Sequence, residues 1–446
     1  MFSAIANIFR IPELRNRILF TLFILFVYRI GAHIPIPGIN IEALREYFME
    51  SQRSGFLDFF DLFSGGALKR FTIFALGIMP YISSSIIVDL LKTVFPYLNN
   101  LSKEGNEGRK KISMYVKYGT VFLCVIQSFA LTTWMKSMKT GTQGSVVPDD
   151  AGITFVLLSI VAITTGTMVL IWLGEIITDR GIGNGISIII MAGIVVRAPQ
   201  AVAQTLRKIT ETGEPIVGIM LVIVFLVVIA ASILLTQGTR RIPVQYGKRM
   251  TGQGMTQATS QFIPMKINAA GVIPIIFASA LLMFPSQILS MVGGFRADGI
   301  LSKLSYWLSP GQPLYVGLYS LLIVFFCYFY TSIKFNPDDI ADNLKKYGGF
   351  IPGIRPGSNT SEYLMFILNR ITLFGSVFLA AIAIVPDFIL KLWPDQVAPE
   401  MAYMFGGTSL LIIVGVALDT LKQIESQLLM RHYDGFIKGK KIKGRF

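Results

Sequence analysis

The chain has 446 residues, of which 53% are hydrophobic and only 15% are charged, and its formal net charge is +14. Soluble domains carry about 25% charged residues, so this composition excludes an ordinary soluble domain. The apolar residues gather into stretches of roughly 20, the length with which a helix crosses a hydrocarbon core of about 30 Å. The sequence therefore predicts a multi-pass membrane protein.

Hydropathy predicts ten membrane-crossing helices. The fifth is the shortest of them and ends at Ala198-Pro199. In chain order the helices are expected at Ile18–Ala32, Ile73–Leu91, Tyr115–Thr133, Ile153–Leu173, Ile186–Val196, Ile216–Leu235, Ala270–Val292, Tyr315–Ile333, Ile371–Leu390 and Phe405–Leu421.

Positive charges gather in alternate loops of this predicted topology. The loops on the side of the N-terminus hold far more Lys and Arg than Asp and Glu, whereas the opposite loops are nearly balanced. Basic loops mark the cytoplasmic side, so we expect both termini in the cytoplasm. The longest polar connections lie on this basic side: Phe95–Met114, Thr236–Asn268, Lys334–Arg370 and Lys422–Phe446.

Five predicted helices lie in residues 1–200 and five in residues 201–446. Such halves have opposite orientations in the membrane, as inverted repeats do, and inverted halves often enclose a path between them. No repeat is visible at the level of residues, so this division rests on topology alone.

Gly55–Gly66 is moderately apolar but too short to cross a membrane. By itself the pattern predicts either an interfacial helix, with its aromatic face among the headgroups, or a re-entrant element buried between helices.

Motifs for catalysis are missing from the sequence. It has no phosphate-binding loop, and Gly181–Gly185 lacks the spacing of a dinucleotide fingerprint. His33 and His432 fall on opposite sides of the predicted membrane, and Cys124 and Cys327 lie inside predicted helices. We therefore expect no catalytic residue, no metal site and no cofactor, and we expect both thiols to be packing residues.

Charged residues inside the predicted helices are the default functional candidates of a membrane protein. Arg29 lies near the outer end of its helix, where it can snorkel, and we expect a structural role. Asp89 stands three residues before Lys92, which predicts an ion pair on the helix surface. Asp419 precedes Lys422 by the same spacing and is interpreted in the same way.

Several strings in the chain resemble signatures of the SecY family, and they follow the family's order from about Ile11 to Tyr433. The strings are Ser64–Leu68, Phe74–Ile82, Trp172–Glu175, Gly181–Ser187, Ala270–Pro274, Ala341–Lys346, Ile351–Gly357 and Phe405–Ser409.

The resemblance implies an all-α, ten-helix clamshell whose two inverted five-helix halves surround an hourglass pore. A ring of aliphatic side chains would seal the waist of that pore, because isoleucine offers water and ions no hydrogen bond and a narrow collar of it dewets. Taken singly, each such residue is ordinarily lipid-facing or packing. By the resemblance the ring consists of Ile78, Ile82, Ile186, Ile190, Ile276 and Ile412.

The resemblance also makes residues 55–66 the plug, a short helix that closes the outer funnel, with Gly65-Gly66 as its hinge. Between the second and third helices on one side and the seventh and eighth on the other, a lateral gate would release hydrophobic segments into lipid. The plug residues would be Phe56, Leu57, Phe59, Phe60, Leu62, Phe63, Ser64, Gly65 and Gly66.

By the resemblance, two of the cytoplasmic loops, Thr236–Asn268 and Lys334–Arg370, would serve as docking sites for a ribosome and for the SecA motor. Exposed Arg pairs well with rRNA phosphates or with carboxylates, although a positive-inside topology alone also accounts for such charges. Relatives often carry an Arg pair where this chain has Gly252-Gln253-Gly254, which puts strong docking at that tip in doubt. The expected docking residues are Arg240, Arg241, Lys248, Arg249 and Arg355.

The sequence thus predicts a passive channel of the bacterial cytoplasmic membrane that is not an enzyme. Its implied partners are the SecE and SecG subunits, SecA, the ribosome, signal peptides and nascent chains, membrane lipid and the YidC insertase. A ten-helix secondary transporter of small solutes is the alternative, and a membrane-embedded enzyme is a third class.

Overall fold

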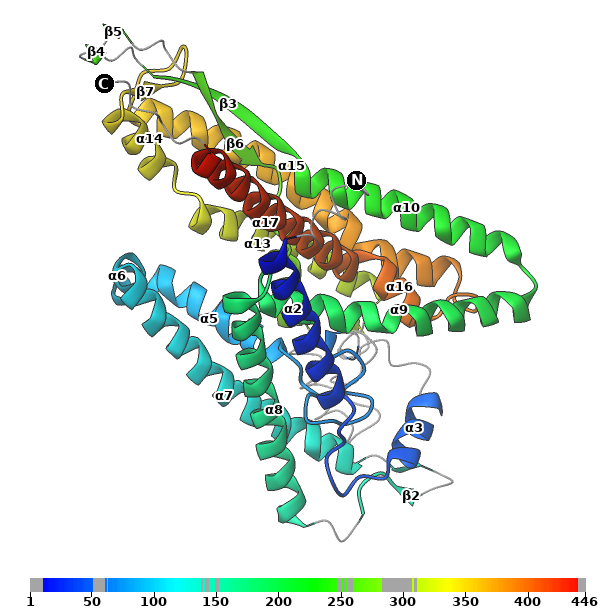
Figure 1. Ribbon diagram of the computed structural model, residues 1–446. Coiled ribbons are helices and arrows are strands. Elements are labelled where there is room, and N and C mark those ends of the chain that lie inside the picture. Colours follow the sequence, from blue (N-terminus) through cyan, green and yellow to red (C-terminus); the bar gives the residue numbers. More distant parts are fainter. Residues whose placement is uncertain are drawn as a thin grey trace. The chain divides into compact units, whose positions relative to one another are not determined.

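The structure is a computed structural model that describes residues 11–50, 61, 63–137, 139–140, 144–148, 152–246, 250–251, 254–255, 260–282, 307–308 and 311–439. The chain divides into two compact units (Figure 1). The first unit comprises Met1–Thr205, Pro399–Met404 and Ile412–Phe446, and the second comprises Leu206–Ala398 and Phe405–Leu411.

The first unit is built from long helices joined by short elements. Its long helices are α2 (Pro12–Gly31), α5 (Met79–Val94), α7 (Asn106–Ser137), α8 (Ile153–Arg180), most of α9 (Gly185–Thr212) and most of α17 (Gly407–Gly439). Its short elements are α3 (Ile41–Glu50), α6 (Pro96–Lys103), α16 (Pro399–Phe405) and the antiparallel pair β1 (Lys139–Thr140) and β2 (Gly144–Ser145).

The second unit combines apolar helices with a small sheet. Its helices are α10 (Pro215–Gln237), Ile273–Leu282, α13 (Pro313–Lys334), α14 (Pro337–Lys346) and α15 (Ser358–Leu392). A three-stranded antiparallel sheet has the order β6 (Ser260–Lys266), β3 (Thr239–Tyr246), β7 (Gly349–Phe350), and β4 (Met250–Thr251) pairs with β5 (Gly254–Met255).

Small residues let the helices of the first unit approach closely. In Figure 1, α5, α7 and α8 lie side by side. Where α5 meets α7, the Ser84 hydroxyl donates to the Val116 carbonyl oxygen at 2.7 Å, and Gly119 faces Ser84. Small residues and interhelical hydrogen bonds are the usual means of helix association in membranes.

The sheet packs one face against helices of its own unit. Along β3, Ile242 and Val244 are buried while their neighbours are exposed, the two-residue alternation of a strand with one covered face. Their cluster includes Leu344 of α14 and Leu364 of α15. Because β3 and β7 pair at Gln245 and Phe350, the sheet joins the two long loops that were expected to be cytoplasmic and to serve in docking.

Seven described helices are long and apolar enough to cross a membrane. They are α7, α8, α9, α10, α13 with α14, α15 and α17 as far as Leu428. The first expected span coincides with α2, the second in part with α5, and the described part of the seventh with Ile273–Leu282.

Two predicted boundaries were wrong. Residues 73–78 were assigned to the second span but form turns. Gly77 has φ +56°, outside the helical range, and Pro80 stands in the first turn of the helix that begins at Met79, where a proline costs no backbone hydrogen bond. The fifth span does not end at Pro199, since α9 continues through it to Thr212. A proline removes one backbone hydrogen bond, and membrane helices tolerate this loss where neighbours compensate.

A close contact between α8 and the turns before α5 generates a stability prediction. A Cβ added at Gly166 would lie 1.9 Å from the carbonyl oxygen of Ile73. We expect Gly166→Ala to lower the free energy of unfolding by about 1–3 kcal/mol, because backbone has to move. Thermal unfolding in detergent measures this. The matched control is Gly218→Ala on α10, where the new Cβ meets its nearest neighbour at 3.6 Å. Equal stability of the two variants would contradict the packing described here.

Candidate functional site

A turn segment, residues 63–78, lies among the helices of the first unit, and its main chain is held by residues 34–36. The Ile36 amide donates to the Phe71 carbonyl oxygen at 3.1 Å, and the Ile73 amide donates to the Ile34 carbonyl oxygen at 3.2 Å. Pro35 and Thr72 form an isolated antiparallel bridge. Non-helical backbone that is packed among helices requires such partners, because a buried amide or carbonyl without a hydrogen bond is costly.

Gly65 and Gly66 give this segment a sharp turn that other residues would not form readily. Their φ angles are +65° and +89°, in the left-handed region that favours glycine. A Cβ at Gly65 would lie 3.0 Å from the Cα of Gly193 on α9. The pair that the sequence analysis expected to be a hinge is therefore a tight turn packed directly against α9.

Helix α2 holds the same turn through hydrogen bonds to its carbonyl oxygens. The Tyr28 hydroxyl donates to Ser64 O at 3.3 Å, and Arg29 Nη1 donates to Gly65 O at 2.8 Å. Arg29 therefore has the expected structural role, but it fulfils that role by binding the turn.

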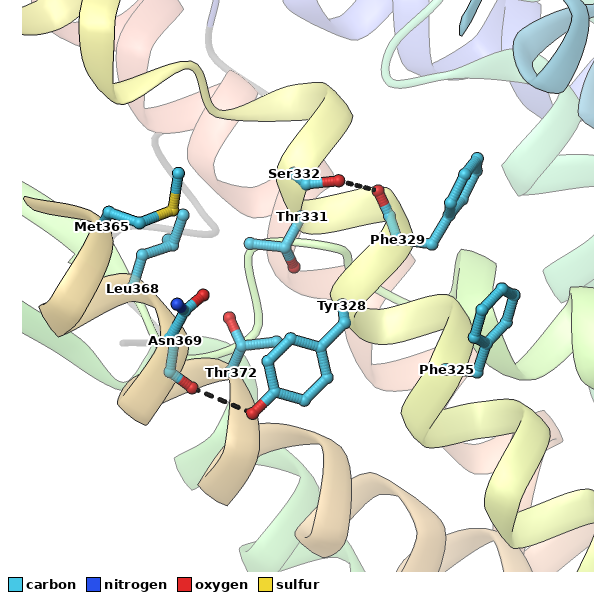
Figure 2. A pocket seen from close by; sticks show the side chains of 9 residues that line it. All are labelled: Phe325, Tyr328, Phe329, Thr331, Ser332, Met365, Leu368, Asn369 and Thr372. Atoms are coloured by element: carbon cyan, nitrogen blue, oxygen red, sulfur yellow. Dashed lines mark hydrogen bonds between the residues drawn. The ribbon is translucent and has the colours of Figure 1, made fainter. Parts of the chain in front are cut away.

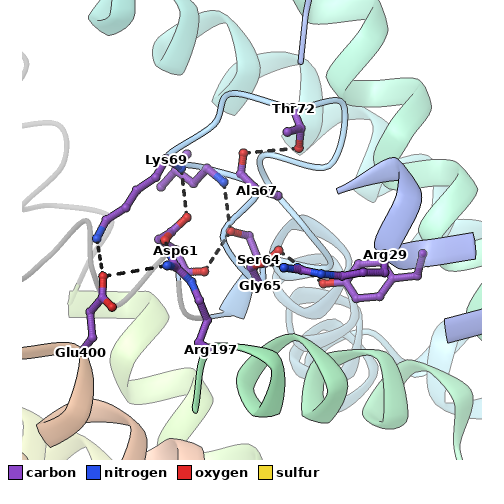
Figure 3. Close-up of polar contacts among 11 residues, drawn as sticks. Arg29, Asp61, Ser64, Gly65, Ala67, Lys69, Thr72, Arg197 and Glu400 are labelled. Carbon is purple, nitrogen blue, oxygen red and sulfur yellow. Dashed lines mark hydrogen bonds and ion pairs between the residues drawn. The ribbon is translucent and has the colours of Figure 1, made fainter. Parts of the chain in front are cut away.

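Four charged side chains form a cluster next to the turn, which we call the charge cluster: Asp61, Lys69, Arg197 and Glu400. Lys69 Nζ lies 2.6 Å from Glu400 Oε1, and Arg197 pairs with Asp61. Figure 3 shows Lys69 and Arg197 both pointing toward Glu400, whose Oε1 is 3.9 Å from Arg197 Nη1. Burial by itself would raise the pKa of Glu400, but the charges of Lys69 and Arg197 outweigh it and hold that pKa below its ordinary value of 4.5.

The charge cluster was not predicted from the sequence. Its members are far apart in the sequence, and only the fold brings α9 and α16 to the turn segment. A weak signal existed, because Arg197 stands in an apolar stretch just before Pro199 and charges in such stretches are seldom without a partner.

None of the six expected ring residues is exposed. Five belong to the first unit and Ile276 belongs to the second. Ile78, Ile190 and Ile412 are buried, at 4%, 8% and 3% exposure, and the other three are half-buried. Ile78 and Ile82 share a helical turn, since the Ile82 amide donates to the Ile78 carbonyl oxygen. The ring itself stays a prediction.

The expected plug and docking residues are described only in part. Phe63, Ser64, Gly65 and Gly66 belong to the turn segment, whereas Phe56, Leu57, Phe59, Phe60 and Leu62 lie outside the described residues. Arg240 and Arg241 are exposed on β3, and Arg355 is exposed in the turn after β7. Lys248, Arg249 and the Gly252-Gln253 step also lie outside the described residues.

The ion pair expected on α5 is confirmed, with Lys92 Nζ 2.6 Å from Asp89 Oδ1. The sequence analysis overlooked Asp387, which follows Pro386 inside the ninth expected span and is 5% exposed. A carboxylate in an otherwise apolar stretch was the signal that would have revealed it. Cys124 and Cys327 are buried, free thiols.

A pocket of about 300 Å³ lies between α13 and α15 in the second unit (Figure 2). Phe325 and Phe329 line one side of it and Leu368 the other, and the Tyr328 hydroxyl donates to the Asn369 carbonyl oxygen at 3.1 Å. No charged side chain lines this pocket. Among the described residues, no group of three metal-binding side chains is present either.

Residues 72–421 match the SecY family. The chain is 45% identical to the protein translocase subunit SecY of Escherichia coli K12, covering 97% of this chain and 96% of that protein. It is 46% identical to the same subunit of Streptomyces galbus, covering 98% of this chain and all of that protein.

Solved structures share the fold at low sequence identity. One described as a protein-conducting channel has a TM-score of 0.63 at 19% identity, covering 92% of this chain and 91% of the other. A SecY structure has a TM-score of 0.61 at 20% identity with the same coverage. In that protein, a plug domain is described as stabilising the closed state of the translocation channel and maintaining a membrane seal. Sec61 in the canine ribosome–channel complex has a TM-score of 0.61 at 18% identity, again with the same coverage.

The lowered pKa of Glu400 predicts how stability depends on pH. Because the folded protein favours the carboxylate, this group contributes its full stability above the ordinary value of 4.5, and the contribution is lost as the pH falls through the lower folded pKa. The difference in unfolding temperature between the wild type and Glu400→Gln should therefore be largest near neutral pH and shrink below about pH 4.5.

Thermal unfolding of the detergent-solubilised protein across this pH range measures the difference. The matched control is Glu42→Gln, which removes an exposed carboxylate from α3, outside the charge cluster, and the pH-dependent difference of Glu400→Gln should exceed that of this control. A difference for Glu400→Gln that is constant with pH, or that grows in acid, would contradict the ion pairing described for Glu400.

Proposed function

The chain belongs to the SecY family, and from that premise we propose that it is the channel through which unfolded secretory polypeptides cross a membrane. Hydrophobic segments would leave the channel sideways into lipid. Near full-length identity of 45% to a protein translocase subunit is the observation that carries this proposal. The chain is a multi-pass membrane protein and not an enzyme, and its family sets aside the alternative of a small-solute transporter.

The proposed seal of the channel has two parts. Ile78, Ile82, Ile186, Ile190, Ile276 and Ile412 would form a dry collar, and residues 55–66 would plug the outer funnel. The low exposure of the collar residues, three of them buried and three half-buried, supports the first part, because isoleucines on the outside of a helix, such as Ile223 at 55% exposure, are open to their surroundings. The tight turn at Gly65-Gly66 supports the second, because it gives the plug a defined attachment point.

The proposed docking surface is the sheet of the second unit. Arg240 and Arg241 on β3 and Arg355 after β7 are exposed cations, and the β3–β7 pairing ties their loops together. Guanidinium groups suit both rRNA phosphates and carboxylates. We expect the ribosome and SecA to bind here, and a solved relative of the same fold is a ribosome-bound channel.

The wider assembly follows from the family. SecE and SecG would complete the channel, signal peptides and nascent chains would be its cargo, and YidC would accept some membrane segments. The location would be the bacterial cytoplasmic membrane with both termini in the cytoplasm, as the basic loops indicate.

Crosslinking tests the collar. With Cys124→Ala and Cys327→Ala as background, we expect Ile82→Cys and Ile276→Cys to form adducts with a stalled secretory polypeptide, because the chain has to pass the collar. Ile223→Cys on α10 is the matched control, since its exposed side chain faces the surroundings of the helix. Adducts of the secretory polypeptide with Ile223→Cys alone would contradict the collar assignment.

A charge reversal tests the docking surface. Arg355→Glu should reduce SecA-driven export at least about tenfold, because a buried or desolvated charge pair at an interface loses about 2–5 kcal/mol when one partner is removed. Insertion of the channel itself into the membrane should persist. The matched control Lys103→Glu reverses an exposed cation on α6, outside the docking loops. Equal loss of export in both variants would show that net charge, and not the docking site, governs the effect.

A further inference from the structure

The charge cluster joins the turn segment to two other elements of the first unit. Asp61 and Lys69 flank the Gly65-Gly66 turn, Arg197 comes from α9 and Glu400 from α16. Lys69 binds Glu400 at 2.6 Å, and Arg197 pairs with Asp61 and approaches Glu400 (Figure 3). The two cations and two carboxylates therefore form one network around the turn.

The network lies almost out of water. The side chain of Asp61 is fully buried, those of Arg197 and Glu400 are 11% and 12% exposed, and that of Lys69 is 22% exposed. Removing one partner of a buried ion pair is costly because it leaves a charge uncompensated. The turn segment cannot move away from α9 and α16 unless these pairs separate.

Contacts inside the turn segment transmit this restraint to the hinge. Asp61 Oδ1 accepts from the Lys69 amide at 2.9 Å, and the Gly66 amide donates to Asp61 O at 2.9 Å. The two charged residues are thereby held on either side of Gly65-Gly66. A Cβ added at Gly66 would lie 3.2 Å from Arg197 Nε, so the guanidinium also touches the turn itself.

The charges suit a restraint that can be released and formed again. Two cations balance two carboxylates, so the closed network has no net charge. Once the turn segment moves out into an aqueous funnel, water solvates the separated charges, which repays part of the cost of breaking the pairs. Apolar packing alone would be less easily opened by water.

We propose that Asp61, Lys69, Arg197 and Glu400 are positioning residues that latch the plug hinge in place while no polypeptide occupies the channel. This inference rests on the proposed function, because it assumes that residues 55–66 are the plug. It adds a specific electrostatic contact, between the hinge and α9 and α16, that favours the sealed channel over the open one.

Resting ion conductance of the reconstituted channel complex tests the latch. Lys69→Glu and Glu400→Lys each place like charges together, and we expect each to raise the resting conductance about tenfold, because the open fraction rises as the closed form is destabilised. The double variant Lys69→Glu/Glu400→Lys restores the opposite-charge pair between positions 69 and 400 but still places a cation 3.9 Å from Arg197, so it should recover part of the seal and leak less than either single variant. A purely structural role would lower the unfolding temperature of the single variants but leave the resting conductance of the folded channel unchanged.

The matched control is Lys92→Glu. It breaks a pair of the same 2.6 Å length whose carboxylate is more exposed, at 28% against 12% for Glu400, and which lies within the single helix α5, so the conductance should equal that of the wild type. The latch is overturned if the single variants seal like the wild type, if the double variant leaks as much as they do, or if Lys92→Glu leaks equally.

A second readout separates the latch from the function on which it rests. SecA-driven transport of a secretory polypeptide is measured on the same preparations. Lys69→Arg, which keeps the positive charge, is the control for misfolding, and we expect it to seal and to transport like the wild type. Absence of transport by the wild type would refute the channel function. Normal transport by the wild type together with tightly sealed single variants would refute the latch alone.

Discussion

Non-helical backbone persists among membrane-crossing helices only where protein groups satisfy its amides and carbonyls. In this chain that constraint falls on the turn segment, residues 63–78. Residues 34–36 pair with its main chain, Tyr28 and Arg29 donate to its carbonyl oxygens, and the charge cluster binds the residues on either side of Gly65-Gly66. The turn is thereby set against α2, α9 and α16, and the proposed plug is attached where this turn begins.

The membrane architecture was largely predictable, because the length of an apolar run alone determines whether a helix can span. The runs of α8, α10 and α13 match the predicted spans closely at their starts. Hydropathy failed where single residues decide the backbone. Residues 73–78 are as apolar as the helix that follows, yet the turn at Gly77 delays the start of that helix to Met79. Pro199 was expected to end the fifth helix, but α9 continues through it.

The pore ring and the plug were assigned only through the family strings, and both stay predictions. Composition cannot distinguish Ile78 or Ile412 from isoleucines that face lipid, since all of them share the same chemistry and differ only in what surrounds them. The charge cluster was out of reach for another reason. Its partners are distant in the sequence, and pairing of Lys69 with Glu400 depends on how α16 packs. The exposure of Arg355 was predictable from the sequence, because a turn rich in Gly and Pro is expected at the surface.

In the proposed function, a polypeptide passes through this chain by parting the isoleucine collar. The most direct test is an experimental structure of the assembled complex with a stalled secretory polypeptide in transit. If the collar is the path, the polypeptide is in van der Waals contact with collar residues of both units, including Ile190 and Ile276. A polypeptide found only on lipid-exposed surfaces such as that of α10, with the collar residues packed among themselves, would contradict it.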